Sequence, residues 1–296
     1  MIWFAAQQTS CFQNNMNDRK FVKIEDSFLV DEDYRDAFGK LGLNSIDGIF
    51  SFTAAEDLAK KNLASFRSRI KFETDSPKSV LFLKRYCRPP LCLQIKNWLA
   101  QKNKISCGRI DFETSAKLLK LGVNTAKVIA FGEQNGPLFE KRSFCITEQI
   151  PNAEAIERKL PDCFIRQTNE TRFLQKKFIR DLAEFVKKFH DTGFRHRDLY
   201  FSHIFYSKDG RFYLIDLSRA FRPLILTEYF RIKDIAQLYY SAPARFFSRT
   251  DRLRFYFFYT GSQNLSKEDR RFITRVIRKA GRIERHDKKH KAKPSV

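Results

Sequence analysis

The stretch that decides the fold runs from Phe194 to Ala220 and reads FRHRDLYFSHIFYSKDGRFYLIDLSRA. Two short runs of strand-forming residues, HIFY and RFYLID, lie on either side of SKDG, which is typical of a tight turn. They predict a β-hairpin with Asp198 shortly before it and Asp216 at its end. Two such aspartates can be ordinary turn residues, so the neighbouring elements and motifs must decide whether they carry chemistry.

The elements around this hairpin are predicted to be helical. Upstream, residues 171–190 carry apolar side chains at intervals of three and four, which indicates a long amphipathic helix. Downstream, IKDIAQLYYSA (232–242) and KEDRRFITRVIRKAG (267–281) also predict helices.

The first half of the chain is instead rich in short β-type runs. Strands are predicted at 43–52, 69–74, 79–86, 126–132 and 143–150, with one helix inserted at 111–122. Near Pro151 the spacing of the apolar residues changes from one typical of strands to one typical of helices. We therefore predict an α+β fold with a β-rich lobe at 1–150, poorly ordered over 1–20, a larger helical lobe at 151–282, and a basic tail at 283–296.

Composition narrows the class of protein. The chain has 296 residues, 43% of them hydrophobic, and a formal net charge of +22. No run approaches the roughly 18 apolar residues of a membrane-spanning helix, and residues 1–17 lack the pattern of a signal peptide. The charge predicts attraction to a polyanion, which can be nucleic acid, acidic lipid or a phosphorylated substrate.

The cysteines do not predict a metal centre. The six cysteines form no C-x-x-C pair, so free thiols are the better interpretation. They are Cys11, Cys87, Cys92, Cys107, Cys145 and Cys163.

The segment His196-Arg197-Asp198-Leu199 resembles the catalytic-loop motif H-R-D-L of protein kinases. This resemblance implies the protein-kinase-like fold, a small β-rich lobe followed by a larger helical one. It implies that Asp198 accepts the proton of the attacking hydroxyl. It also implies that Asp216, in LIDLS, binds the Mg²⁺ that bridges the phosphates of ATP.

Upstream residues complete the resemblance. Lys84 lies inside the apolar run VLFLKRY, where an ammonium group needs a partner. The resemblance implies that Lys84 grips the ATP phosphates and that Glu113 orients it, with Glu148 as the alternative carboxylate. It further implies that TEQI, which contains Glu148 and Ile150, is the hinge beside adenine, and that Asp234 braces the catalytic loop.

The chain departs from ordinary protein kinases in ways that matter. His203 stands where kinases place an asparagine ligand for the second Mg²⁺. We expect His203 either to bind the metal weakly or to hydrogen-bond Asp198 or a phosphate instead, and packing under the loop is the alternative. No G-x-G-x-x-G precedes Lys84, no A-P-E follows Asp216, and Ser218-Arg219 replaces Phe-Gly.

These departures are themselves a pattern. R-D-L-Y-x-x-H-I followed by I-D-L-x-R-A resembles the lipopolysaccharide core kinases of the WaaP/InaA type, and FLKRYCRPP, KDIAQLYYSA and TDRLRFYFFY extend the resemblance over roughly residues 40–260. It implies ATP- and Mg²⁺-dependent phosphorylation of a heptose or Kdo hydroxyl. The implied partners are a lipid-linked core oligosaccharide and the anionic inner membrane, with the protein peripheral on its cytoplasmic face.

Other functions remain open at this point. An atypical protein or small-molecule kinase of the same fold is the main alternative. A pseudokinase should have lost Lys84, Asp198 or Asp216, and all three are present. A nucleic-acid partner is not expected, because no recognition helix or RNP-type aromatic motif is found.

Overall fold

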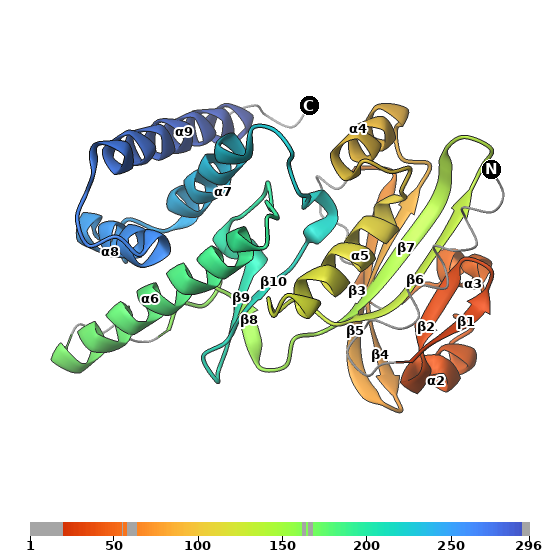
Figure 1. The fold of residues 1–296 in the computed structure, drawn as a ribbon. Coiled ribbons are helices and arrows are strands. Elements are labelled where there is room, and N and C mark those ends of the chain that lie inside the picture. Colours follow the sequence, from red (N-terminus) through yellow and green to blue (C-terminus); the bar gives the residue numbers. More distant parts are fainter. Residues whose placement is uncertain (1–19, 55, 58–63, 162–163, 165–167, 292–296) are drawn as a thin grey trace. The chain divides into compact units, whose positions relative to one another are not determined.

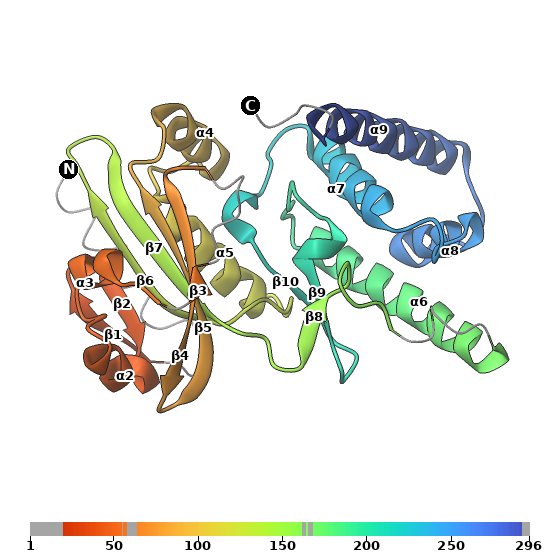
Figure 2. The ribbon, with the colours of Figure 1, turned by 180° about the vertical axis from the view of Figure 1, so that it is seen from behind.

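The computed structural model describes residues 20–54, 56–57, 64–161, 164 and 168–291. The chain forms two compact units, Met1–Pro151 and Asn152–Val296, which we call the sheet unit and the helical unit. Figures 1 and 2 show the elements of each unit from opposite sides. Residues 1–19, predicted to be poorly ordered, lie outside the described ranges.

The sheet unit is built on a seven-stranded antiparallel sheet in the order β1-β2-β6-β7-β5-β4-β3. The strands are β1 Phe21–Glu25, β2 Phe28–Asp31, β3 Glu56–Asp57, β4 Arg67–Asp75, β5 Lys78–Cys87, β6 Val128–Asn135 and β7 Glu140–Glu148. The helical segments are η1 Glu32–Tyr34, α2 Arg35–Lys40, α3 Ile46–Ser51, α4 Leu91–Gln101 and α5 Cys107–Lys120.

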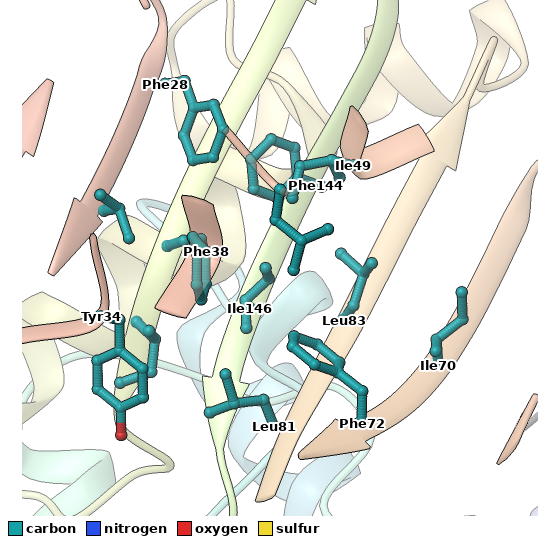
Figure 3. Packing of buried hydrophobic residues seen from close by; sticks show 14 of the residues in the cluster. Phe28, Tyr34, Phe38, Ile49, Ile70, Phe72, Leu81, Leu83, Phe144 and Ile146 are labelled. Atoms are coloured by element: carbon teal, nitrogen blue, oxygen red, sulfur yellow. The ribbon is translucent and has the colours of Figure 1, made fainter. Parts of the chain in front are cut away.

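Strand alternation divides the sheet into two buried faces. Phe144 and Ile146 of β7 pack into a core that includes Phe38 of α2 and Ile49 of α3 (Figure 3). Cys145, between them in the sequence, belongs to a second cluster with Phe112 of α5. Helix α5 therefore covers the face opposite to α2 and α3, as the two ribbon views show (Figures 1 and 2).

Helix α5 lies unusually close to the sheet at Gly108. A Cβ atom at this position would lie 2.7 Å from the carbonyl oxygen of Phe144 in β7. Only glycine fits there, so Gly108 sets the distance between α5 and the strand beside Lys84.

The helical unit combines a small sheet with four long helices. Its strands, in the order β10-β9-β8, are β8 Ala153–Ala155, β9 Ile204–Ser207 and β10 Phe212–Leu214. Its helices are α6 Asn169–Asp191, α7 Thr227–Ser241, α8 Arg249–Thr260 and α9 Lys267–Lys291, with short 3-10 turns η3 Phe201–His203 and η4 Leu217–Arg219. Helix α6 packs against α8, and α7 packs against α9.

Most predicted elements are present. The long helix, the hairpin and four of the five predicted strands correspond to α6, β9–β10 and β4–β7. The strand predicted at 43–52 is wrong, because this segment contains α3. Ser45 caps that helix by accepting a hydrogen bond from the Gly48 N–H at 2.9 Å, and Ile46 and Ile49, three residues apart, are buried.

The predicted basic tail also differs in the structure. Helix α9 continues to Lys291, so most of the segment assigned to a tail from residue 283 is helical. An ion pair one turn apart, between Lys288 and Glu284 at 2.7 Å, favours this continuation.

The four described cysteines have free thiols. Cys87 and Cys92 are exposed, whereas Cys107 and Cys145 are buried, and burial raises the pKa of both buried thiols. Cys11 and Cys163 lie outside the described residues.

Candidate active site

In the sheet unit, Lys84 is nearly buried and held by a carboxylate. Its Nζ lies 3.3 Å from Oδ2 of Asp111, and the two side chains are 16% and 6% exposed. The hydroxyl of Tyr86 donates to the same oxygen at 3.2 Å. Because Lys84 and Tyr86 are two residues apart in β5, both point to the face of the sheet that α5 covers.

The helix carboxylate beside Lys84 is therefore Asp111 and not the predicted Glu113. Residues two apart on a helix do not share a face, and the Glu113 carboxylate accepts a hydrogen bond from Lys117 at 2.8 Å. The spacing could have indicated Asp111. This residue precedes Ser115 and Leu118 by four and seven positions, so it lies on the same side of α5 as these two buried residues. A carboxylate on such a face needs a cation or donor.

Glu148 lies at the end of β7, and its carboxylate contacts side chains of the sheet unit. Its Oε1 accepts hydrogen bonds from the hydroxyls of Tyr34 and Ser79, at 2.9 and 2.8 Å, and its Oε2 lies 3.6 Å from Lys127 Nζ. Burial, together with Glu148, raises the pKa of Tyr34 to about 12, so its phenol stays protonated and donates. The side chain thus fixes the strand that leads to Ile150, which is buried.

In the helical unit, one side of α7 holds the loop that carries Asp198. The fully buried carboxylate of Asp234 accepts the backbone N–H groups of His196 and Arg197, each at 2.7 Å. Lys233 and Gln237 donate to the Arg197 carbonyl at 2.6 and 2.8 Å. Asp234 therefore braces the loop, as predicted. Burial lowers the pKa of Lys233 to about 8.

Asp198 is oriented by an arginine that the sequence analysis noted only as a departure. Nη1 of Arg219, in η4, donates to both carboxylate oxygens of Asp198, at 3.0 and 2.8 Å. The side chain of Asp198 is 23% exposed, so its carboxylate is accessible to solvent. The arrangement is a carboxylate held in one orientation on a rigid loop, which is what a general base requires.

Asp216 is joined to the catalytic loop through its neighbour Ile215. The Ile215 N–H donates to the His203 carbonyl at 3.1 Å, and the Ile215 carbonyl lies 3.0 Å from Nε2 of His196. Asp216 itself has a left-handed backbone, φ 57° and ψ 60°, and accepts a hydrogen bond from Ser218 at 3.0 Å. Such a conformation in a residue other than glycine is strained and is typical of functional sites.

His203 bonds the loop through one nitrogen. Its Nδ1 lies 2.7 Å from the Asp198 carbonyl oxygen. Because a carbonyl can only accept, Nδ1 carries a proton and donates it, and Nε2 is the nitrogen left for another partner. The contact is with the backbone of Asp198, and Nε2 takes no part in it.

The donor chemistry here fits Mg²⁺. Among the described residues, no group of three or more His, Cys, Asp or Glu side chains is arranged to hold a metal. Mg²⁺ in kinases is held by one or two protein ligands together with substrate phosphates, so such a group is not required. Asp216 would supply the hard oxygen that this ion prefers, and the softer Nε2 of His203 is the second candidate.

A comparison with solved structures identifies the fold. The solved structure of "WaaP in complex with acyl carrier protein" is similar with a TM-score of 0.62 and 21% identity, covering 86% of this chain and 98% of that one. The protein therefore has a protein-kinase-like fold, as predicted.

The family follows from the sequence match. The model of the lipopolysaccharide kinase (Kdo/WaaP) family matches residues 96–259, and the chain belongs to this family of kinases. The lipopolysaccharide core heptose(I) kinase WaaP of Pseudomonas aeruginosa PAO1 is 29% identical over 54% of this chain, and the match spans 62% of the relative's length. The enzyme of that name from Escherichia coli K12 is 29% identical over 66% of this chain and 75% of its own.

Proposed function

We propose that this protein is an ATP-dependent kinase that phosphorylates a sugar hydroxyl, of heptose or Kdo, in the inner core of lipopolysaccharide. Family membership and the names of the relatives support this proposal. The observation that carries it is Asp198, partly exposed, held by Arg219 and mounted on a loop that Asp234 braces.

Each candidate residue has one role in this proposal. Lys84, kept in place by Asp111, binds the α- and β-phosphates of ATP. The backbone of Glu148 and Ile150 bonds the adenine ring. Asp216, with His203, holds Mg²⁺, which supplies positive charge to the phosphate oxygens when it is bound.

The proposed reaction is a direct displacement at phosphorus. The sugar oxygen forms a bond to the γ-phosphorus, the bond from that phosphorus to the β–γ bridging oxygen breaks, and ADP leaves. Asp198 accepts the proton of the sugar hydroxyl. The hydrogen bonds from Arg219 keep the carboxylate oriented while that proton moves.

The acceptor proposed is a lipid-linked core oligosaccharide, bound at the cytoplasmic face of the inner membrane. The net charge of +22 supports an anionic acceptor and an anionic surface. No helix within the described residues is long and apolar enough to cross a bilayer. We propose peripheral association and no nucleic-acid partner.

The test is transfer of labelled phosphate from ATP. We expect label to enter lipid-linked core oligosaccharide and not casein, and mass spectrometry of the product would identify the sugar. Incorporation into protein alone would favour the second candidate, an atypical protein kinase.

The matched variant is Asp198→Asn, which keeps the shape of the side chain but removes the base. We expect transfer to fall by about 10²-fold or more with little change in melting temperature. Turnover near that of the wild type in this variant would show that Asp198 is not the base.

A further inference from the structure

The solvent face of α9 carries a continuous row of positive charge. Seven of its exposed basic residues follow each other at intervals of four, four, three, four, three and four, which places these seven on one side of the helix. They are Lys267, Arg271, Arg275, Arg278, Arg282, Arg285 and Lys289, and we call them the basic stripe. Phe272, Val276 and Ala280 are buried on the side that faces the protein.

The described residues neutralise little of this charge. None of the acidic residues of α9 falls on the spacing of the stripe. Arg275 pairs with Glu228 at 2.5 Å, and the part of the chain that the structure describes supplies no ion pair to the other six. At 1.5 Å per residue, the stripe is a straight row about 33 Å long.

An exposed apolar segment lies beside the stripe. Leu224, Ile225 and Leu226 are 75%, 77% and 63% exposed and immediately precede α7. The first turn of α7 contacts α9, through the ion pair of Glu228 with Arg275 and a distance of 3.4 Å between Lys279 Nζ and the Tyr229 hydroxyl. Single exposed aliphatic residues are ordinary, but three in succession beside a basic helix indicate a binding surface.

We propose that the basic stripe and Leu224–Leu226 together form a membrane-docking surface for an anionic lipid bilayer. Basic side chains are attracted to anionic headgroups, while adjacent aliphatic side chains enter the acyl boundary. A nucleic acid would match the charge but offers no apolar phase for Leu224–Leu226. The inference deepens the proposed function and rests on it, because a lipid-linked acceptor lies in such a membrane.

The first test is flotation with vesicles of phosphatidylcholine, with and without phosphatidylglycerol. The full chain should bind only the anionic vesicles. The triple variant Arg278→Gln, Arg282→Gln, Arg285→Gln should bind them at least about tenfold more weakly, since each basic residue near such a surface contributes severalfold. Circular dichroism would check that α9 remains folded.

A matched control removes equal charge elsewhere in the helical unit. Lys176, Lys188 and Lys208 are exposed and lie outside α9. Their triple replacement by glutamine should leave vesicle binding unchanged. Equal losses in the two triple variants would overturn the assignment to the stripe, as would full binding by the α9 variant.

The second test concerns insertion. Leu224→Ser with Ile225→Ser should weaken binding to anionic vesicles about tenfold, because two exposed aliphatic side chains no longer enter the bilayer. In an Ile225→Trp variant, the emission should shift to the blue when these vesicles are added. An unshifted emission, or nucleic-acid binding lost in the α9 variant while vesicle binding persists, would overturn the proposal.

Failure here is distinguishable from failure of the proposed function. Phosphorylation of a soluble, delipidated core oligosaccharide should be unaffected in the α9 and Leu224/Ile225 variants. If the wild type phosphorylates no core sugar but the vesicle results hold, the surface stands and the proposed function fails.

Discussion

The contact between Arg219 and Asp198 shows how the departure from the usual kinase sequence affects the proposed base. In η4, Arg219 follows Asp216 by three residues, and one of its nitrogens reaches both oxygens of Asp198. This fixes the direction in which the carboxylate points. We therefore regard Arg219 as a positioning residue.

Arg219→Met should lower kcat by about tenfold with a much smaller change in the KM for ATP, because the base loses its orientation. Arg219→Lys should restore part of the loss, since a single ammonium can also donate to both oxygens. Steady-state kinetics measure both. Arg222→Met, three residues further at an exposed site, is the control and should behave as wild type. No rescue by lysine would argue against an orienting hydrogen bond.

At His203, the hydrogen bond to the loop makes the metal question testable. An asparagine could keep that bond by donating to the Asp198 carbonyl, and it would offer a harder oxygen ligand. If His203 binds Mg²⁺, His203→Asn should reach half-maximal turnover at a lower Mg²⁺ concentration. Magnesium titrations of both proteins measure this. Identical curves would leave His203 with a packing role.

At the scale of elements, α6, the catalytic loop and α7 meet at Asp234. His190 of α6 contacts both α7 and α8. Its Nε2 lies 3.3 Å from Oδ2 of Asp234, and its Nδ1 lies 2.8 Å from the hydroxyl of Tyr259 in α8. Burial lowers the pKa of both His190 and His196 below the ordinary 6.5. The two imidazoles are therefore held neutral in the folded helical unit.

This burial predicts a loss of stability in acid. Below the ordinary pKa the unfolded chain binds protons that the folded histidines do not, so the free energy of unfolding should fall as pH drops through about 6.5. Urea unfolding at a series of pH values measures the slope. His190→Gln should flatten it, whereas His286→Gln, at an exposed site on α9, should not. A slope that His190→Gln leaves unchanged would contradict neutral burial.

The sequence predicts the helices and strands whose apolar residues repeat at a clear interval. It misses features that depend on a local cap or on a contact with a distant part of the chain. The apolar repeat was sufficient to predict α6, and the turn SKDG with its flanking runs was sufficient to predict the hairpin of β9 and β10. In α3, by contrast, Ile49, Phe50 and Phe52 suggest a strand, and only the cap at Ser45 and burial on one side reveal the helix. Asp111 was missed because its partner, Lys84, comes from β5, a contact that spacing within one helix does not show.

For the whole molecule, the resemblance to kinases predicted the fold and the family, and the nucleotide is the natural probe of the intact chain. ATP with Mg²⁺ should raise the melting temperature, since a ligand that binds the folded state stabilises it, by about 2.7 kcal/mol at 100 times its Kd. Asp216→Ala should abolish the part of this shift that needs Mg²⁺, while Asp198→Asn should retain it. Scanning fluorimetry with ATP, with or without a chelator, measures the shift.

The control is Asp209→Ala, in the turn of the same hairpin. The carboxylate of Asp209 accepts hydrogen bonds from Ser207 and Arg211. Its Mg²⁺-dependent shift should equal that of the wild type. A full shift in Asp216→Ala would remove Asp216 from the metal site.

The bonds from Asp234 to His196 and Arg197 have a consequence for affinity. They are made within the chain, so the loop that carries Asp198 acquires its conformation when the helical unit folds. Fixing the backbone of one residue costs about 1–2 kcal/mol of conformational entropy. Because this cost is met when the unit folds, the proposed binding of nucleotide and acceptor would not have to spend free energy on ordering the loop. The loop is preorganised, and the interactions of the substrates remain available to stabilise the transition state.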